Sequence, residues 1–284
     1  MNSKELLKLL TLEQLDDGRF EGQNQDIGAA SVFGGQVVGQ ALAAAEATVE
    51  GRPAHSLHSY FLRPGNKTIP IIYDVERVRD GGSFSTRRVV AEQQGEVIFI
   101  LSASFQKTES GFDHQTDMPD VPAPEDLPDE SEIRLAMATS LEPERQAFFT
   151  SERPVEMRPL YPDDLWNKTT RPAQQGFWLR VNTEIPDSPK LHRALLAYAS
   201  DFYLMGTALR PHGERFSSAG MLAASLDHAM WFHRDFRINE WMLYTMDSPT
   251  ASGGRGLNLG SFYKRDGTLV ATCMQEGLMR MGRK

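Results

Sequence analysis

The sequence of 284 residues contains a single cysteine, Cys273, and no long apolar run. One cysteine cannot form an internal disulfide, which argues against a secreted fold held together by disulfide bridges. No stretch approaches the 18 consecutive apolar residues typical of a membrane-spanning helix, so we expect no membrane span. The N-terminal stretch has charges within its apolar part and no small-residue cleavage site, unlike a signal peptide. These absences predict a soluble protein located in the cytoplasm.

The sequence also has no dense block of lysine and arginine. Its 30 Lys and Arg are outnumbered by 38 Asp and Glu, which gives a formal charge of −8. A nucleic-acid-binding protein needs a positive surface to displace counterions, so we expect no nucleic-acid partner. The fractions of hydrophobic (40%) and charged (24%) residues are ordinary for a globular protein, and the length suggests about two domains.

Motifs for metal, nucleotide or covalent serine chemistry are missing as well. The histidines are scattered, and a single cysteine rules out zinc sites built from several thiolates. There is no Gly-x-Ser-x-Gly elbow, no phosphate-binding loop and no dinucleotide fingerprint. We therefore expect neither a metal nor a cofactor.

Apolar spacing predicts three helices. A short amphipathic helix is expected over residues 6–15, and a stronger one over 35–49, where apolar residues recur every three or four positions. A third begins at Pro189-Lys190, and its apolar positions continue through Phe202 to Met205. Asp201 falls within this third helix, on its apolar face.

Alternating apolar residues predict four strands after each of the two longer helices. The expected strands are 55–62, 69–79, 83–92, 96–106, 221–232, 240–246, 255–264 and 268–279. Short turns at Asp80-Gly-Gly and Gln94-Gly indicate antiparallel hairpins, and similar turns recur 172 residues later at Ser252-Gly-Gly and Asp266-Gly. Ser56-Leu-His also resembles Ser225-Leu-Asp. We infer an internal duplication of one helix followed by an antiparallel sheet.

An acidic, proline-rich stretch over residues 113–132 separates the two halves. It is unsuited to a strand or a long helix, so we interpret it as an interdomain linker, with a further helix expected over 133–149. The expected division is a first repeat over 1–108, a linker over 109–170 and a second repeat over 171–284.

Two buried polar positions are candidates for function. A lone carboxylate on an apolar helix face, as expected for Asp201, needs either a hydrogen-bonding partner or a chemical task; capping a backbone amide is the structural alternative. Gln275 shares an apolar strand face with Ala271 and Cys273, where a position at the rim of the sheet is the simpler interpretation. Asp227 and His228 are adjacent on a strand, so they face opposite ways and cannot form a direct relay; a polar rim is expected there.

Two further groups have structural interpretations. The aromatic residues around Trp231, Trp241 and Tyr244 are expected to form core between sheet and helix. Several arginines are expected to lie on a solvated face, or else to receive the phosphates of an anionic substrate. These arginines are Arg63, Arg77, Arg79, Arg87, Arg88, Arg234 and Arg255.

Four segments together resemble the type II acyl-CoA thioesterases (the TesB family). They are Phe33-Gly-Gly-Gln-Val-Val-Gly-Gln-Ala-Leu42, His58-Ser-Tyr-Phe-Leu-Arg-Pro-Gly65, Arg79-Asp-Gly-Gly-Ser-Phe-Ser-Thr-Arg-Arg-Val89 and Ser225-Leu-Asp-His-Ala-Met-Trp-Phe-His233. Gln275-Glu-Gly277 is similar too. The resemblance extends from about Phe20 to Met279 and is loosest in the acidic linker.

The resemblance implies an α+β double hotdog, in which two long helices are each wrapped by an antiparallel sheet. It also implies hydrolysis of acyl-CoA to fatty acid and CoA without a metal or covalent intermediate, and a homo-oligomeric assembly. The family's catalytic Asp, Thr or Ser, and Gln correspond to Asp201, Ser225 and Gln275, with water as the nucleophile. Serine replaces the commoner threonine here and keeps the hydroxyl.

Two alternatives remain open. One is a non-catalytic module that binds acyl-CoA. The other is hydration of enoyl thioesters, whose hotdog enzymes carry a Gly-Asp-x-Asn-Pro-x-His motif; here Gly206 stands five residues after Asp201, and the motif is absent.

Overall fold

The structure is a computed structural model that describes residues 1–138, 146, 150, 152–165, 168–216, 218 and 220–282. Its described strands form one antiparallel sheet with the order β1-β2-β4-β5-β6-β3-β10-β13-β12-β11-β8-β7, and β9 also pairs with β13. The strands of the first half are β1 (Glu13–Asp16), β2 (Arg19–Gly22), β3 (Ala54–Phe61), β4 (Ile71–Asp80), β5 (Phe84–Gln93) and β6 (Glu96–Gln106). Those of the second half are β7 (Glu156–Pro159), β8 (Gln174–Arg180), β9 (Met221–Ser225), β10 (Asp227–Phe232), β11 (Met242–Ser252), β12 (Arg255–Lys264) and β13 (Leu269–Met281). The helical segments are α1 (Ser3–Leu9), α2 (Gly34–Ala47), η1 (Pro124–Asp126), α3 (Glu130–Ala138), η2 (Pro162–Asp164), α5 (Pro189–Ala199) and η3 (Leu204–His212).

The strand order is the same when followed outward from the centre in either direction. Outward from the centre, β3-β6-β5-β4-β2-β1 in one half corresponds to β10-β13-β12-β11-β8-β7 in the other. The halves join where β3 pairs with β10, with His58 opposite Ala229. This symmetry confirms the duplication and the α+β double-hotdog fold inferred from the sequence.

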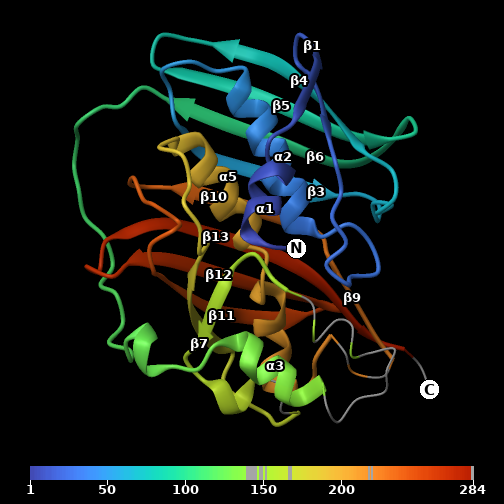
Figure 1. Ribbon diagram of the computed structural model, residues 1–284, viewed down its shortest axis with the longest axis vertical. Coiled ribbons are helices and arrows are strands. Elements are labelled where there is room, and N and C mark those ends of the chain that lie inside the picture. The colour runs from blue at the N-terminus through green and yellow to red at the C-terminus, as the bar shows by residue number, and fades with distance from the viewer. Residues whose placement is uncertain are drawn as a thin grey trace.

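The two central helices pack directly against each other on one side of the sheet (Figure 1). Glycines allow the close approach: a Cβ on Gly35 would lie 2.3 Å from the backbone oxygen of Tyr198, and one on Gly39 would lie 2.9 Å from that of Ala194. Apolar residues of α2, α5 and the inner sheet face form the main core around them. The ends of both helices are thereby held next to the β3–β10 junction.

Most predicted strands are found with small differences in their ends, but the strand expected over 240–246 runs from Met242 to Ser252 as β11, six residues further than predicted. The bounds expected for β6 and β12 agree with the structure. The single strand expected over 221–232 is wrong: it is interrupted at Leu226, giving β9 and β10. The short strands β1, β2, β7 and β8 were not expected, and β7 lies inside the range assigned to the linker.

Two helix predictions need correction. The first helix ends at Leu9 rather than near residue 15, and the exposed Leu15 belongs to β1. The helix expected to run to Met205 ends at Ala199, so Asp201 lies just beyond α5 and not within it. Of the helix expected over 133–149, the part up to Ala138 belongs to α3; residues 139–145 and 147–149 lie outside the described residues.

The acidic linker runs along the outside of the second half (green, Figure 1). Met118, Val121 and Leu127 pack on a second apolar cluster on the outer face of the sheet, formed by Trp178, Trp241, Leu243, Tyr263 and Leu269. Trp241 therefore belongs to this outer cluster, which corrects the expectation that it lies between sheet and helix. Tyr244, three residues later in β11, lies in the main core as expected.

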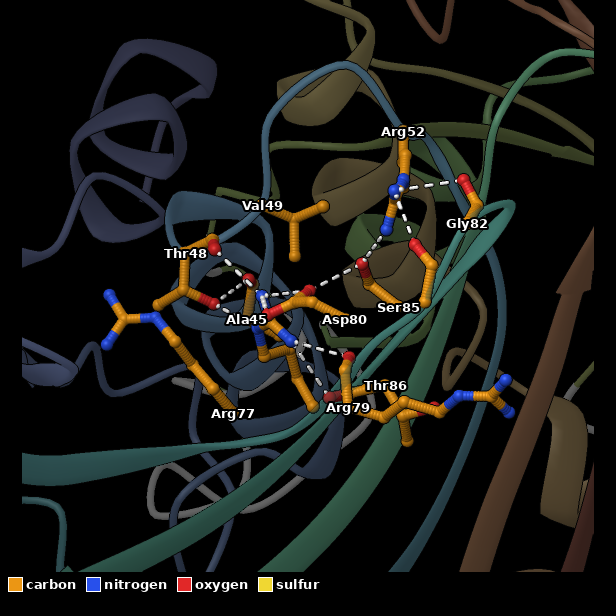
Figure 2. A network of polar contacts seen from close by, with 12 residues as sticks. Ala45, Thr48, Val49, Arg52, Arg77, Arg79, Asp80, Gly82, Ser85 and Thr86 are labelled. Carbon is orange, nitrogen blue, oxygen red and sulfur yellow. Dashed lines mark hydrogen bonds and ion pairs between the residues drawn. The ribbon is translucent and has the colours of Figure 1, made fainter.

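In the first half, a buried arginine ties the end of α2 to the β4–β5 turn. Arg87 is 2% exposed; it donates to the backbone and hydroxyl oxygens of Thr48 and to Asp80, which also accepts from Ser85. Arg52 donates to the backbone of Gly82 and to Ser85 in the same network (Figure 2). This network fills the region where α2 ends.

Within the described part of the chain, no helix has the length and apolar character that crossing a membrane requires.

Candidate active site

Asp201 lies where α5 ends and the chain turns sharply. Ser200 N–H still bonds to Leu196 O in the helical pattern, but Tyr203 adopts a left-handed conformation (φ 62°) before the 3-10 helix η3. Oδ2 of Asp201 accepts a hydrogen bond from the backbone N–H of Gly35, 2.9 Å away in the first turn of α2. The carboxylate of one repeat is thus held by the helix N-terminus of the other, which favours negative charge.

A second glycine makes this contact possible. A Cβ on Gly34 would lie 2.8 Å from Oδ2 of Asp201 and 3.1 Å from the ring of Phe61. The Gly34-Gly35 pair therefore lets the start of α2 approach the carboxylate closely. The sequence segment that carries this pair belongs to the site, although it was singled out only as part of a resemblance.

Gln275 connects Asp201 with Ser225. Its amide Nε2 donates to Oδ1 of Asp201 at 2.6 Å and to Oγ of Ser225 at 3.2 Å. Gln275 is fully buried, whereas Asp201 and Ser225 are half-buried. All three residues predicted from the sequence therefore meet at one place, and the interpretation of Gln275 as a rim residue is wrong.

The interruption between β9 and β10 places Ser225 beside Gln275. Ser225 pairs with Gly277 in β13, and Leu226 N–H donates to Glu276 O. Leu226 O accepts from Phe61 N–H of the first half, so the break also connects the two repeats. The Asp227 side chain accepts a hydrogen bond from Glu276 N–H at 2.6 Å, so its carboxylate is bonded to the backbone of β13.

His228 is a component of the site that the sequence interpretation assigned to a polar rim, and that assignment is wrong. It is completely buried, with Nδ1 3.4 Å from Gln275 Nε2 and Nε2 2.9 Å from Ser200 Oγ. Because the amide is a donor, Nδ1 accepts, and the ring hydrogen on Nε2 is donated to Ser200, which donates to Ala197 O. Alternation with buried Met230 along β10 was the signal that His228 faces inward.

Burial keeps His228 uncharged. Desolvation lowers the pKa of this imidazole below 6.5, although the nearby Asp201 carboxylate acts in the opposite direction. A neutral imidazole suits its role as acceptor for the Gln275 amide, since a protonated ring would present two donors. His228 and Asp201 thus both accept from the Gln275 amide and fix its orientation.

One polar atom at the centre of the site has no partner. Oε1 of Gln275 is buried and accepts no hydrogen bond among the described residues. An unpaired buried carbonyl oxygen is costly, so such an atom is suited to accept a hydrogen bond from a ligand or water.

Most of the arginines considered as phosphate-binding candidates are engaged elsewhere. Arg63, Arg77, Arg87, Arg88, Arg234 and Arg255 form ion pairs with Glu96, Asp17, Asp80, Glu76, Asp113 and Glu276, respectively. One of these pairs, Asp113 with Arg234, attaches the acidic linker to the second repeat, and so does a further pair between Glu125 and Arg265. The carboxylates of the linker therefore form ion pairs with these arginines, which are then not free to bind an anionic substrate. Among the residues that the structure covers, no cluster of His, Cys, Asp or Glu has the arrangement of a metal site.

Comparison with known proteins agrees with this architecture. Residues 144–278 match the family model described as acyl-CoA thioesterase, and residues 22–106 match the model for the acyl-CoA thioesterase N-terminal domain. The chain is 47% identical to Acyl-CoA thioesterase 2 of Haemophilus influenzae over 276 residues, covering 97% of this chain and 96% of that protein. It is 43% identical to human Acyl-coenzyme A thioesterase 8, covering 96% and 88% of the two chains.

One solved structure is similar to this chain at a sequence identity comparable to those of the two relatives above. The crystal structure of acyl-CoA thioesterase II TesB2 from Mycobacterium marinum aligns with a TM-score of 0.79 and 42% identity, covering 96% of this chain and 97% of that one. With a duplicated hotdog fold and near-complete alignment to these relatives, the chain belongs to the type II acyl-CoA thioesterase family.

Proposed function

We propose that the protein hydrolyses acyl-CoA thioesters to a free fatty acid and CoA, and that Asp201, Ser225 and Gln275 activate the attacking water. The observation that carries the assignment of residues is the amide of Gln275, which contacts both the carboxylate and the hydroxyl. The partial exposure of Asp201 and Ser225 gives a water molecule access to these two side chains, and the buried, unpaired Oε1 of Gln275 is a further acceptor for it.

In the proposed reaction, Asp201 is the general base. It takes a proton from the water held by Ser225 and Gln275 as the water oxygen bonds to the thioester carbon. General-base assistance of this kind contributes about 10²–10⁴ in rate. The C–S bond then breaks, and the CoA thiolate leaves and takes up a proton.

The N-terminus of α2 lies beside the proposed oxyanion position. Gly35 N–H donates to Asp201 Oδ2, which places the buried first turn of this 14-residue helix at the site. First-turn N–H groups with the helix dipole behind them stabilise negative charge that develops on the thioester oxygen. The acyl chain is expected to lie in an apolar channel between helix and sheet.

A chain-length series of saturated acyl-CoAs tests the activity. Thiol release, followed with a thiol-reactive dye, should be accompanied by equimolar free fatty acid measured by mass spectrometry. Binding of acyl-CoA without thiol release would replace the proposal with the non-catalytic binding module. Conversion of enoyl-CoA to 3-hydroxyacyl-CoA without free CoA would replace it with a hydratase.

Three further expectations form part of this proposal. The division into repeats over 1–108 and 171–284, with a linker over 109–170, is tested by limited proteolysis, which should cut first within the linker. Assembly into a homo-oligomer, implied by the family resemblance, is tested by light scattering after gel filtration. A cytoplasmic location is tested by cell fractionation.

A further inference from the structure

A cavity of about 640 Å³ lies at the opposite end of the helix pair from Asp201. Its wall includes the start of α5 at Pro189 and His192, the start of β3 at Ala54, and the segment that follows β10 from Phe232 to Arg237. Residues from both repeats line it, as they do at the proposed catalytic site.

Backbone contacts identify the cavity as the symmetry counterpart of the catalytic site. After β10, the N–H groups of His233 and Arg234 both donate to Val270 O. After β3, beside the catalytic site, the N–H groups of Leu62 and Arg63 both donate to Ile98 O. The loop that borders the cavity therefore makes the same two backbone hydrogen bonds as the loop beside the catalytic site.

Strand register shows what replaces two of the catalytic residues. Ser225 pairs with Gly277, and the corresponding pair in the first repeat is Ala54 with Phe105. Gln275 pairs with Asn258, and the corresponding pair is Ala103 with Arg87. The hydroxyl and the amide are thus both replaced by alanine methyl groups.

The remaining position has a carboxylate that is already engaged. Asp201 lies eleven residues after Lys190, the second residue of α5, and Glu46 lies eleven residues after Gly35, the second residue of α2. The Glu46 side chain is 2% exposed and bonds to Arg193 Nε at 2.7 Å. The counterpart cavity therefore has the same backbone framework as the catalytic site but lacks the groups that would activate water.

A buried donor in the cavity wall has no partner. His192 is 2% exposed, and its Nδ1 accepts from Ile238 N–H at 3.3 Å. The ring hydrogen therefore lies on Nε2, which has no hydrogen-bond partner among the described residues. A buried donor without an acceptor is suited to a carbonyl or phosphate oxygen of a ligand.

The charges of the wall also favour an anionic ligand. Its ionisable residues comprise five Lys and Arg and four Asp and Glu. Arg193, Arg234 and Arg237 are held in ion pairs, so the two lysines are the cations placed to meet an anion. Lys107 is exposed at the rim, and Lys264 is 33% exposed with only a 3.6 Å ion pair to Asp266. These two ammonium groups can reach phosphate groups at the opening.

We propose that this cavity is a second, non-hydrolytic binding site for the coenzyme A moiety. The inference depends on the proposed function, since it takes the ligand class from the catalytic counterpart. One chain then binds two CoA groups and hydrolyses a thioester at only one of them.

The test is the binding stoichiometry of a non-hydrolysable dodecyl thioether of CoA, measured by isothermal titration calorimetry. The wild-type chain should bind two ligands. The double variant Lys107→Glu/Lys264→Glu should bind one, or bind the second at least about tenfold more weakly, because it reverses two charges at the rim. Its kcat for dodecanoyl-CoA at saturating substrate should stay within twofold of wild type. The matched variant Lys4→Glu/Arg88→Glu changes the same charges on exposed residues outside the cavity and should still bind two.

A stoichiometry of one ligand per wild-type chain would overturn the proposal of a second site. The proposal would also be overturned if both double variants bound the second ligand with the same affinity. If thiol release from acyl-CoA is absent in the wild type, the proposed function fails instead. The stoichiometry and the thiol assay thus separate the two failures.

Discussion

The side-chain amide of Gln275 lies 2.6 Å from Oδ1 of Asp201, while the backbone amide of Gly35 lies 2.9 Å from Oδ2. Each oxygen of the carboxylate is therefore held by one N–H group, and the two donors come from different repeats. A carboxylate fixed in this way keeps lone pairs directed at the space beside Ser225. Four predictions concern this arrangement, and a fifth concerns Glu46 near the other end of α2.

Replacement of the carboxylate should remove catalysis without unfolding the protein. Asp201→Asn keeps the side-chain shape but cannot act as a base, so thiol release should fall at least about a hundredfold. The melting temperature, followed by circular dichroism, should change little. Asp16→Asn, at an exposed strand position, is the matched control and should keep full activity. Near-normal turnover of palmitoyl-CoA by Asp201→Asn would remove Asp201 from the mechanism.

His228 should act by positioning Gln275. His228→Leu removes the acceptor below the amide and introduces an apolar side chain. We expect kcat to fall about tenfold and KM to change less than twofold, because the residue does not reach the substrate. Equal losses of kcat in His228→Leu and in His233→Leu, which lies on the exposed side of the sheet end, would argue against the positioning role.

The same variant has a pH signature. The folded protein holds the pKa of His228 below 6.5, so the unfolded chain binds more protons as pH falls through that value. This histidine therefore destabilises the wild type progressively below about pH 6.5. Urea unfolding between pH 5 and 7.5 should show that the stability of His228→Leu, relative to wild type, increases on acidification. A pH-independent difference would contradict the buried, neutral state.

The close approach of α2 and α5 should depend on Gly35. A Cβ in Gly35→Ala would lie 2.3 Å from Tyr198 O and would separate the helices. We expect a loss of about 1–3 kcal/mol in unfolding free energy, together with reduced activity, since the Asp201 contact lengthens. Gly82→Ala is the control, because nothing lies within 4 Å of its added methyl group. Equal stability of the two variants in urea titrations would refute this account of the helix contact.

Glu46 should make stability depend on pH in the opposite direction. Desolvation raises its pKa from 4.5 to about 7, although Arg193 partly offsets this effect. The folded protein therefore binds more protons than the unfolded chain between these values, and stability from this group falls as pH rises from about 4.5 to 7. The slope is at most about 1.4 kcal/mol per pH unit. Glu46→Gln should remove this slope in urea titrations, and an unchanged slope would show that another group causes it.

The sequence was sufficient to predict the fold and to name three side chains that the structure brings together, but not to predict their local geometry. The spacing of Phe202 and Met205 continued the helical period of α5, so the pattern could not show that the helix ends at Ala199. The left-handed turn at Tyr203 and the hydrogen bond from the Ser200 hydroxyl to Ala197 O accompany that end. The turn depends on tertiary packing, since Tyr203 stacks on Phe177 of β8.

The missed strands and the missed histidine have different causes. β1 is exposed along its whole length and β7 has four residues, so neither carries enough alternation to be recognised. Pairing with β2 and β8 is what stabilises them. His228 was detectable from the alternation of β10, but its partner Ser200 comes from a distant helix end, and no local pattern brings those two residues together.

The junction of β3 with β10 has a consequence for the evolution of the chain. In a pair of identical subunits, every substitution appears at both symmetric positions, so a change that disables one site disables the other. Covalent fusion of the halves removes this constraint. Ala54 and Ala103 could then diverge from Ser225 and Gln275, while Gly34 and Gly35 of the same half stayed suited to the one site that keeps its polar groups.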